Sequence, residues 1–166
     1  MSGRSGSSDR PGRVTRLCVA RESTSTRNFV AVPAVVLAEQ ALSRRHVRPA
    51  WATLAAWGYL QYRLCGRYRT ARGGGGPGLS NPPVSLVTTG PHALSRNPMY
   101  LGHLIFLAAL TVGTGSPLAL AYTAWSLAWF DRRAAGDESR LAEHFGEEYL
   151  RYRERVARWA PRPMGL

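Results

Sequence analysis

The chain has 166 residues, a length that allows one domain. Its net charge of +12 comes from 22 basic residues, all of them arginine, against 10 acidic residues. The arginines cluster beside apolar runs and not along a polar helix face, which favours cytoplasmic loops near a membrane over a nucleic-acid interface.

Cys18 and Cys65 are too few and too far apart for a disulfide framework or a metal site, so we expect free thiols and no metal.

The first 27 residues are rich in Ser, Gly, Arg and Thr and contain no continuous apolar core. They do not resemble a secretory signal, and we expect a disordered basic tail on the cytoplasmic side of a membrane. Four apolar stretches follow, at 29–42, 50–65, 99–112 and 117–130.

Each apolar stretch is shorter than the roughly 20 residues of a comfortable bilayer span, and each alone is compatible with a core helix of a soluble bundle. Together they favour a membrane, because the last two form a nearly uncharged hairpin broken only by the turn signal at 113–117. The sequence therefore predicts an all-α fold, an integral membrane helical bundle of about four transmembrane helices. These helices make two hairpins, at 28–66 and 98–132, joined by a connector at 67–97.

The positive charge in the short loops predicts that the connector and both termini are cytoplasmic. One loop, 44–48, carries three arginines and would then lie outside, against the rule. Within the connector, the glycine run 73–78 predicts a flexible linker. A phosphate-binding loop is the alternative there, but no Lys-Ser or Lys-Thr follows it and no strand precedes it. We expect an extended segment at 82–87 whose backbone lines a pocket.

A helix start is predicted where the connector meets the second hairpin. Asn97 is a good N-cap residue, and Pro98 suits the first helical position, where a missing N–H costs nothing. The unpaired N–H groups of that helix start would form an anion site beside Arg96.

A further amphipathic helix is predicted at 136–160, where apolar residues recur every three or four positions. Glu138 shares the inward face of this helix, whereas Asp137 lies on its other flank. The stripe consists of Leu141, Phe145, Tyr149, Tyr152, Val156 and Trp159.

The residue pattern argues against hydrolytic chemistry, because there is no Gly-x-Ser-x-Gly elbow, no suitable Cys-His pair and no metal-ligand spacing. The predicted elements instead gather a polar cluster at the membrane surface, suited to a zwitterion or a nucleotide. Tyr100 and His103 have an alternative role in hydrogen bonding between helices. The cluster comprises Arg96, Asn97, Tyr100, Arg133, Asp137 and Glu138, with His92 and His103 nearby.

Two sequence blocks carry a resemblance that covers about half the chain. The first runs from Leu86 to Gly102 and contains Gly90-Pro91-His92 and Arg96-Asn97-Pro98; the second begins Asp137-Glu138-x-x-Leu141. In this order, across an apolar hairpin, they resemble the isoprenylcysteine carboxyl methyltransferase and phospholipid methyltransferase superfamily. That family usually has Gly-Pro-Tyr, then Arg-His-Pro or Arg-Asn-Pro, and later Glu-Glu-x-x-Leu.

The resemblance implies an integral membrane enzyme that binds S-adenosylmethionine in a cytoplasm-facing pocket closed by the C-terminal helix. A lipophilic or lipid-linked acceptor would enter from the bilayer. By position, Arg133 and Glu138 would be catalytic, with Arg133 on the acceptor side. Arg96 and the helix start would suit the cofactor's carboxylate, and Asp137 or Glu138 its ammonium group or ribose hydroxyls. The implied cofactor-binding residues are Leu86, Val87, His92, Arg96, Asn97, Pro98, Met99, Tyr100, Asp137 and Glu138.

The sequence departs from the family pattern at two positions, with His92 in place of a tyrosine and Asp137 in place of a glutamate. Two other functions therefore stay open: a sterol-reductase-like membrane protein that binds NADPH, and a non-catalytic membrane scaffold of the same fold. The acceptor is not determined, and isoprenylated cysteine, a phospholipid amine, a small thiol and a quinone-like acid all fit. The all-arginine basic complement suggests a GC-rich bacterial genome and hence a bacterial inner membrane.

Overall fold

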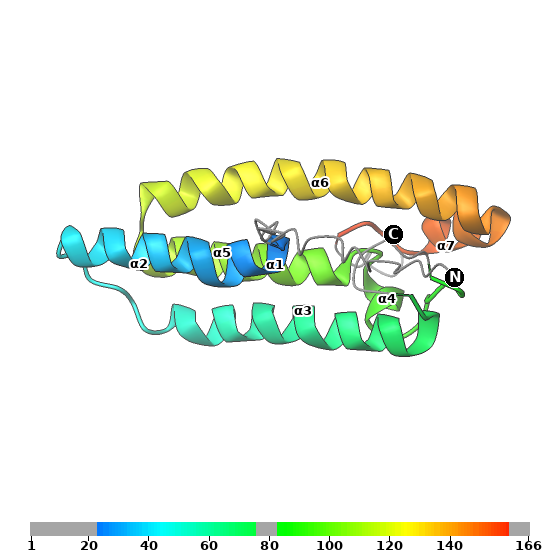
Figure 1. Ribbon diagram of the computed structural model, residues 1–166, viewed down its shortest axis with the longest axis horizontal. Helices are drawn as coiled ribbons and strands as arrows, with labels where there is room; N and C mark the ends of the chain where they lie inside the picture. Colours follow the sequence, from blue (N-terminus) through cyan, green and yellow to red (C-terminus); the bar gives the residue numbers. More distant parts are fainter. Residues whose placement is uncertain (1–22, 76–82, 160–166) are drawn as a thin grey trace, which may run out of the picture.

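The computed structural model describes residues 23–75 and 83–159, which form an elongated bundle of helices (Figure 1). These residues contain no strand, so the all-α prediction is confirmed for this part of the chain. Residues 1–22 of the predicted basic tail and residues 76–78 of the glycine run lie outside the described residues.

Four long helices occupy the places of the four apolar stretches. They are α2 (Val32–Leu42), α3 (Trp51–Gly73), α5 (Pro98–Thr114) and α6 (Pro117–Phe145), and α6 runs along the whole bundle (Figure 1). Four shorter elements complete the described fold: α1 (Thr24–Thr26), the π-helical turn η1 (Arg27–Ala31), α4 (Pro91–Leu94) and α7 (Glu147–Arg155).

The helices at the predicted transmembrane spans do not meet the requirements of a membrane crossing. Among the described residues, no helix combines the length and the apolar character that a membrane crossing requires. The 17 residues of α5 rise only about 25 Å, against about 30 Å of hydrocarbon in a typical bilayer. The longer helices α3 and α6 carry charged side chains in their C-terminal parts, from Arg63 in α3 and from Asp131 in α6.

Two predicted boundaries differ from the structure. α3 continues beyond the first hairpin and ends only at the glycine run, where Gly74 adopts a φ of 67°. The second hairpin and the start of the predicted 136–160 helix form one continuous helix, α6, because no residue between 131 and 145 breaks it. The break comes at Gly146, whose φ of 52° favours glycine. The predicted stripe is therefore divided, and Val156 and Trp159 follow the end of α7.

The turn between α5 and α6 brings the two blocks of the motif together. α5 ends at Gly115, which has a φ of 59°, and the Ser116 side chain accepts a hydrogen bond from the N–H of Ala119 to cap α6. α6 then returns antiparallel to α5. This return places Asp137 and Glu138 opposite the start of α5, at the end of the bundle that also holds α4 and α7 (Figure 1).

The segment from Ser23 to Thr26 is structured, although the prediction assigned it to the disordered tail. The Ser23 side chain accepts a hydrogen bond from the N–H of Thr26 and caps α1. The next turn, η1, places the ring of Phe29 against Tyr62 of α3 and His103 of α5, with ring centroids 5.1 and 4.5 Å away. Aromatic packing thus holds this segment to the bundle.

Candidate functional site

A cavity of about 480 Å³ lies where α3, α5 and α6 meet the connector and α7. This volume falls within the roughly 300–1,000 Å³ of small-molecule sites. Eleven residues expected at a functional site all line it, although they come from two blocks separated by a helical hairpin. They are Leu86, Val87, His92, Arg96, Asn97, Pro98, Met99, Tyr100, Arg133, Asp137 and Glu138.

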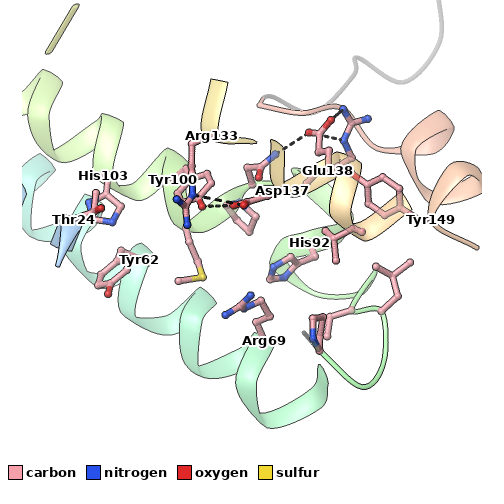
Figure 2. Close-up of a pocket in the computed structure, with 18 of the residues that line it drawn as sticks. Thr24, Tyr62, Arg69, His92, Tyr100, His103, Arg133, Asp137, Glu138 and Tyr149 are labelled. Carbon is pink, nitrogen blue, oxygen red and sulfur yellow. Dashed lines mark hydrogen bonds and ion pairs between the residues drawn. The ribbon is translucent and has the colours of Figure 1, made fainter. Parts of the chain in front are cut away.

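The side chains divide the cavity into regions of different character. Figure 2 shows Thr24, Tyr62 and His103 toward one end, and His92, Arg69 and Tyr149 toward the other. We call these the aromatic end and the connector end. Tyr100, Arg133 and Asp137 lie between the two ends (Figure 2). The arrangement suits two ligands that meet in the middle of one cavity.

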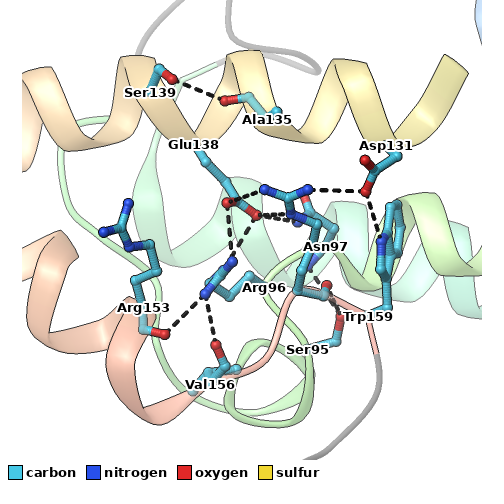
Figure 3. Close-up of polar contacts among 11 residues, drawn as sticks. Ser95, Arg96, Asn97, Asp131, Ala135, Glu138, Ser139, Arg153, Val156 and Trp159 are labelled. Atoms are coloured by element: carbon cyan, nitrogen blue, oxygen red, sulfur yellow. Dashed lines mark hydrogen bonds and ion pairs between the residues drawn. The ribbon is translucent and has the colours of Figure 1, made fainter. Parts of the chain in front are cut away.

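Glu138 is the centre of a buried ion network (Figure 3). Its side chain is 8% exposed, and its two carboxylate oxygens accept hydrogen bonds from Arg96 at 3.0 and 3.3 Å and from Arg158 at 3.1 Å each. Asn97 Nδ2 donates to the same carboxylate at 3.1 Å. Five hydrogen bonds from these three side chains compensate the cost of burying the charge.

Arg96 was expected to lie beside a ligand anion, but its guanidinium is engaged by groups of the protein. Its Nε and Nη2 donate to Glu138, and its Nη1 donates to the carbonyl oxygens of Arg153 and Val156 at 2.9 and 3.0 Å. The guanidinium therefore ties the end of α7 to the start of α5. A ligand carboxylate would have to compete with these contacts, so Arg96 supports the wall of the cavity.

Asn97 occupies the predicted N-cap position of α5, but its side chain does not cap the helix. The amide donates instead to Glu138, because the buried carboxylate needs donors and Asn97 faces it across the cavity wall. Ser95 Oγ accepts the N–H of Asn97 at 3.2 Å. Pro98 is the first residue of α5, as predicted from its missing N–H.

Asp137 is the second buried carboxylate of the site, with 10% of its side chain exposed. Tyr100 donates its hydroxyl to Oδ2 at 2.5 Å, and Arg140, one turn further along α6, donates to Oδ1. Arg133 Nε lies 3.6 Å from the same Oδ1, and 46% of the Arg133 side chain is exposed. Asp137 thus joins α5 to α6 and orients both Tyr100 and Arg133 at the middle of the cavity.

His92 and Tyr149 form the buried wall of the connector end. Burial, and after it the positive charge of Arg69, lowers the pKa of His92 from 6.5 to about 4, so the imidazole is neutral at physiological pH. Burial also raises the pKa of Tyr149 to about 12, with a further rise from the Glu138 charge. Neither His92 Nδ1 nor the Tyr149 hydroxyl has a hydrogen-bond partner within residues 23–75 and 83–159.

α7 is held against the connector by its second buried tyrosine. The Tyr152 hydroxyl donates to the carbonyl oxygen of His92 at 2.6 Å. Further along, the Arg96 N–H donates to the carbonyl oxygen of Ala157, and Ser95 Oγ donates to that of Arg158. The segment after α7 therefore closes the cavity from the same side as the connector.

Several lining residues were not expected from the sequence. Tyr149 belongs to the predicted apolar stripe, but nothing in that stripe distinguishes a cavity wall from a core position. Arg158 is not a lining residue, but it pairs with Glu138, which is, and this pairing depends on the break at Gly146. Ser23, Thr24 and Ser25 were assigned to the tail, and no local signal places them at a cavity. Tyr62 and Trp129 also line it.

Comparisons with known proteins give relatives for the connector and the second hairpin. The phospholipid methyltransferase family model matches residues 75–148. Protein-S-isoprenylcysteine O-methyltransferase of Xenopus laevis is 35% identical over 78 residues, which are 46% of this chain and 27% of that protein. The corresponding A enzyme of Arabidopsis thaliana is 36% identical over 77 residues, 46% of this chain and 39% of that protein.

An uncharacterised protein of Haemophilus influenzae is 39% identical over 62 residues, which are 37% of this chain and 98% of the relative. This chain therefore spans between about a quarter and two fifths of the methyltransferases above, and nearly all of the short bacterial relative. No solved structure matches the chain.

The fold and the cavity define an α-helical protein with an internal cavity of small-molecule size, built from a helix start and from two adjacent carboxylates one hairpin later. Both features fall within residues 75–148, which the family model matches. The chain belongs to the superfamily of isoprenylcysteine carboxyl methyltransferases and phospholipid methyltransferases.

Proposed function

We propose that the protein is a membrane-embedded methyltransferase that uses S-adenosylmethionine and acts on a hydrophobic or membrane-delivered acceptor. The observation that carries this proposal is the single cavity shared by the two motif blocks, with one wall toward the connector and one toward an aromatic end. Methyl transfer needs two ligands in contact, and the cavity has two different ends for them.

The connector end fits the chemistry of S-adenosylmethionine. Two buried polar atoms in its wall, His92 Nδ1 and the Tyr149 hydroxyl, have no partner among the described residues, and buried groups of this kind require a ligand or an ordered water. The backbone at Leu86 and Val87, which is neither helix nor strand, offers N–H and C=O groups to the edge of a purine ring. A flat nucleoside with polar edges satisfies both requirements.

The amino-acid end of the cofactor would lie near the middle of the cavity. The first N–H groups of α5, at Met99 and Tyr100, precede the first backbone bond, which Leu101 donates to the carbonyl oxygen of Asn97. They suit a carboxylate. The Asp137 carboxylate, held by Tyr100, suits an ammonium group or a hydroxyl. Arg96 and Glu138 support the cofactor indirectly, by fixing the position of the α5 start.

When bound, the cofactor supplies a methyl group on a positively charged sulfur, which an acceptor atom takes by in-line displacement. The chain then has to align the two ligands and exclude water, a contribution worth up to roughly 7–11 kcal/mol. The Arg96 and Tyr152 contacts exclude water by closing α7 over the cavity. Arg133, between the two ends, orients the acceptor as a fixed cation.

A position in the bacterial inner membrane is supported by the distribution of exposed apolar side chains. Most of them gather on η1 and α2, on the first part of α3 and on the first part of α6, away from the charged end that holds the cavity (Figure 1). An exposed apolar surface of this extent is typical of contact with lipid. These residues are Val30, Val35, Leu37, Leu42, Leu54, Trp57, Tyr59, Leu60, Leu64, Leu118, Leu120, Trp125 and Leu127.

In this orientation the charged end, which holds the connector and α7, faces the cytoplasm, where the donor is supplied. The acceptor reaches the aromatic end from the lipid. The name of the animal and plant relatives includes one acceptor of this kind, isoprenylated cysteine.

The test is a titration of the full chain in lipid nanodiscs with S-adenosylmethionine and, separately, with NADPH. We expect saturable binding of S-adenosylmethionine. Binding of NADPH alone would overturn the proposal in favour of a reductase-like protein, and binding of neither would favour a scaffold. Membranes incubated with methyl-labelled cofactor then identify the acceptor through the labelled product.

A substitution at Tyr149 sharpens this test. Because its buried hydroxyl has no partner in the protein, Tyr149→Phe should stabilise the ligand-free protein by about 1 kcal/mol. The same change should weaken S-adenosylmethionine binding about tenfold, through the loss of one ligand hydrogen bond. Tyr59→Phe, at an exposed tyrosine outside the cavity, is the matched control.

A further inference from the structure

The aromatic end of the cavity contains a histidine that the proposed chemistry has not yet used. His103 lies on α5 and is 3% exposed. Its ring stacks on Phe29 with centroids 4.5 Å apart and on Phe130 with centroids 5.2 Å apart, and Tyr62 packs against it at 4.7 Å. The ring is therefore held in one orientation, and it lines the cavity.

A chain of hydrogen bonds from three elements determines which nitrogen of His103 carries the proton. The Tyr122 hydroxyl on α6 donates to Asn28 Oδ1 at 2.7 Å. Asn28, in η1 and fully buried, then turns its Nδ2 toward His103 Nδ1 at 3.3 Å. An amide nitrogen only donates, so Nδ1 must accept and the ring must carry its proton on Nε2.

We propose that His103 is a positioning residue, whose Nε2–H donates a hydrogen bond to an oxygen of the methyl acceptor at the aromatic end of the cavity. The Tyr122–Asn28 relay keeps this N–H in place. The inference rests on the proposed function, because it concerns the second ligand of the same cavity.

The relay also specifies the chemical class of the acceptor. Arg133 on the same cavity has only donors to offer, and His103 in this tautomer offers an N–H. Two donors complement a carboxylate or a phenolate oxygen, whereas an ammonium or an amine would bring further N–H groups against them. The acceptor class is therefore a lipophilic molecule with an anionic oxygen.

The placement of this relay argues for a ligand. Polar side chains in an apolar helical bundle are costly unless they are fully paired, and Asn28 and Tyr122 satisfy each other. The remaining Asn28 hydrogen bond goes to His103 Nδ1. His103 Nε2 has no hydrogen bond among the described residues. If His103 served only to pack the bundle, either tautomer would suffice. The relay fixes one tautomer, and this favours a ligand at Nε2.

The tautomer is tested first, because this test needs no acceptor. The full chain is labelled with ¹⁵N-histidine in nanodiscs, and the His103 signals are assigned by their absence in His103→Gln. We expect a neutral ring with its proton on Nε2, and Asn28→Asp should move a proton onto Nδ1 because a carboxylate only accepts. A native ring with its proton on Nδ1 would overturn the proposal.

The second test uses two lipid probes that differ in one group: N-acetyl-S-farnesylcysteine, which has a carboxylate, and S-farnesylcysteamine, which has an amine. His103→Asn keeps a polar group at the Nδ1 position but loses the Nε2–H that faces the cavity. This variant should therefore bind the carboxylate probe at least tenfold more weakly. His103→Gln, whose amide reaches the Nε2 position, should restore binding. The amine probe should respond to neither change.

Equal binding of the carboxylate probe by the native protein and His103→Asn would overturn the positioning role. A preference of the native protein for the amine probe would overturn the acceptor class. His144→Gln, on the exposed end of α6, is the control. Failure of the proposed function is recognised separately, by the absence of S-adenosylmethionine binding to the native protein.

Discussion

Gly58 of α3 and Gly102 of α5 lie with their backbones in direct contact where the two helices cross. A Cβ atom built on Gly58 would be 2.7 Å from the carbonyl oxygen of Gly102, and one built on Gly102 would be 2.7 Å from that of Gly58. Real Cβ atoms do not approach this closely, so only glycine fits at either position. The contact positions α5, and with it the wall of the cavity, against α3.

Gly102→Ala should therefore destabilise the protein by about 3 kcal/mol or more, because the helices must separate to admit a methyl group. Gly136→Ala is the control on α6, where a Cβ would meet nothing within 4 Å. Alanine should stabilise that helix by up to about 1 kcal/mol. Thermal unfolding in nanodiscs measures both changes, and an equal response of the two variants would contradict the close contact.

Arg96→Ala should destabilise the protein by about 3 kcal/mol, because it leaves the buried Glu138 carboxylate with only Arg158 and Asn97. It also removes the two bonds to carbonyl oxygens at the end of α7. Chemical denaturation provides the free energy of unfolding. Arg153→Ala keeps the carbonyl that Arg96 uses and removes only an exposed side chain, so its stability should stay within about 0.5 kcal/mol of the native value.

The stability of the protein should depend on pH through His92. Its pKa is about 4 in the folded chain and 6.5 as an ordinary value, so between these pH values the unfolded chain binds a proton that the folded chain does not. Stability is then complete above about pH 6.5. It should fall by about 3 kcal/mol as the pH decreases to about 4.

His92→Gln should remove this slope, because glutamine does not titrate. The check is the midpoint of thermal unfolding, measured from pH 4 to pH 7.5 for the native chain, His92→Gln and the exposed-site control His144→Gln. The first variant should have the flatter profile. Parallel profiles for all three proteins would mean that His92 is not buried as a neutral ring.

The proposed contact with lipid predicts the effect of charges on the apolar surface. Leu60 and Leu127 are 47% and 51% exposed, on α3 and α6. Replacing both with glutamate should reduce flotation with liposomes at least tenfold, because a charged side chain in the bilayer costs on the order of 2–3 kcal/mol. Thr70→Glu combined with Ser139→Glu adds the same charges to the polar ends of the same two helices and should leave flotation unchanged.

Local signals in the sequence were sufficient for the second hairpin and for the residues of the two motif blocks that meet at the cavity. Pro98 and the turn at Gly115 determine where α5 begins and ends, and both act within a few residues. Because α5 and α6 are joined by a two-residue turn, they must return antiparallel. The start of α5 and the carboxylates on α6 then lie together, as the order of the two blocks indicated.

The partners of the side chains could not be predicted in the same way. Asn97 has a strong local preference for capping, but a buried carboxylate 41 residues away takes its amide. Arg96 was expected to face an anion, yet carbonyl oxygens at the end of α7 and Glu138 engage it. The contacts of Arg96 with these carbonyl oxygens depend on the return of the chain after Gly146, which no pattern near residue 96 records.

The path of the segment after α7 has a consequence for the order in which the protein is made. Residues 156–158 supply carbonyl oxygens to Ser95 and Arg96, although they emerge from the ribosome 60 or more residues after these two partners. They also supply a second guanidinium to Glu138, which lies 20 residues before Arg158. Until then, a nascent chain that has already folded its helices keeps an underpaired carboxylate at the mouth of the site. The cavity is therefore closed only after residues 156–158 have been made, and a chain that stalls before Val156 has the bundle without a closed cavity.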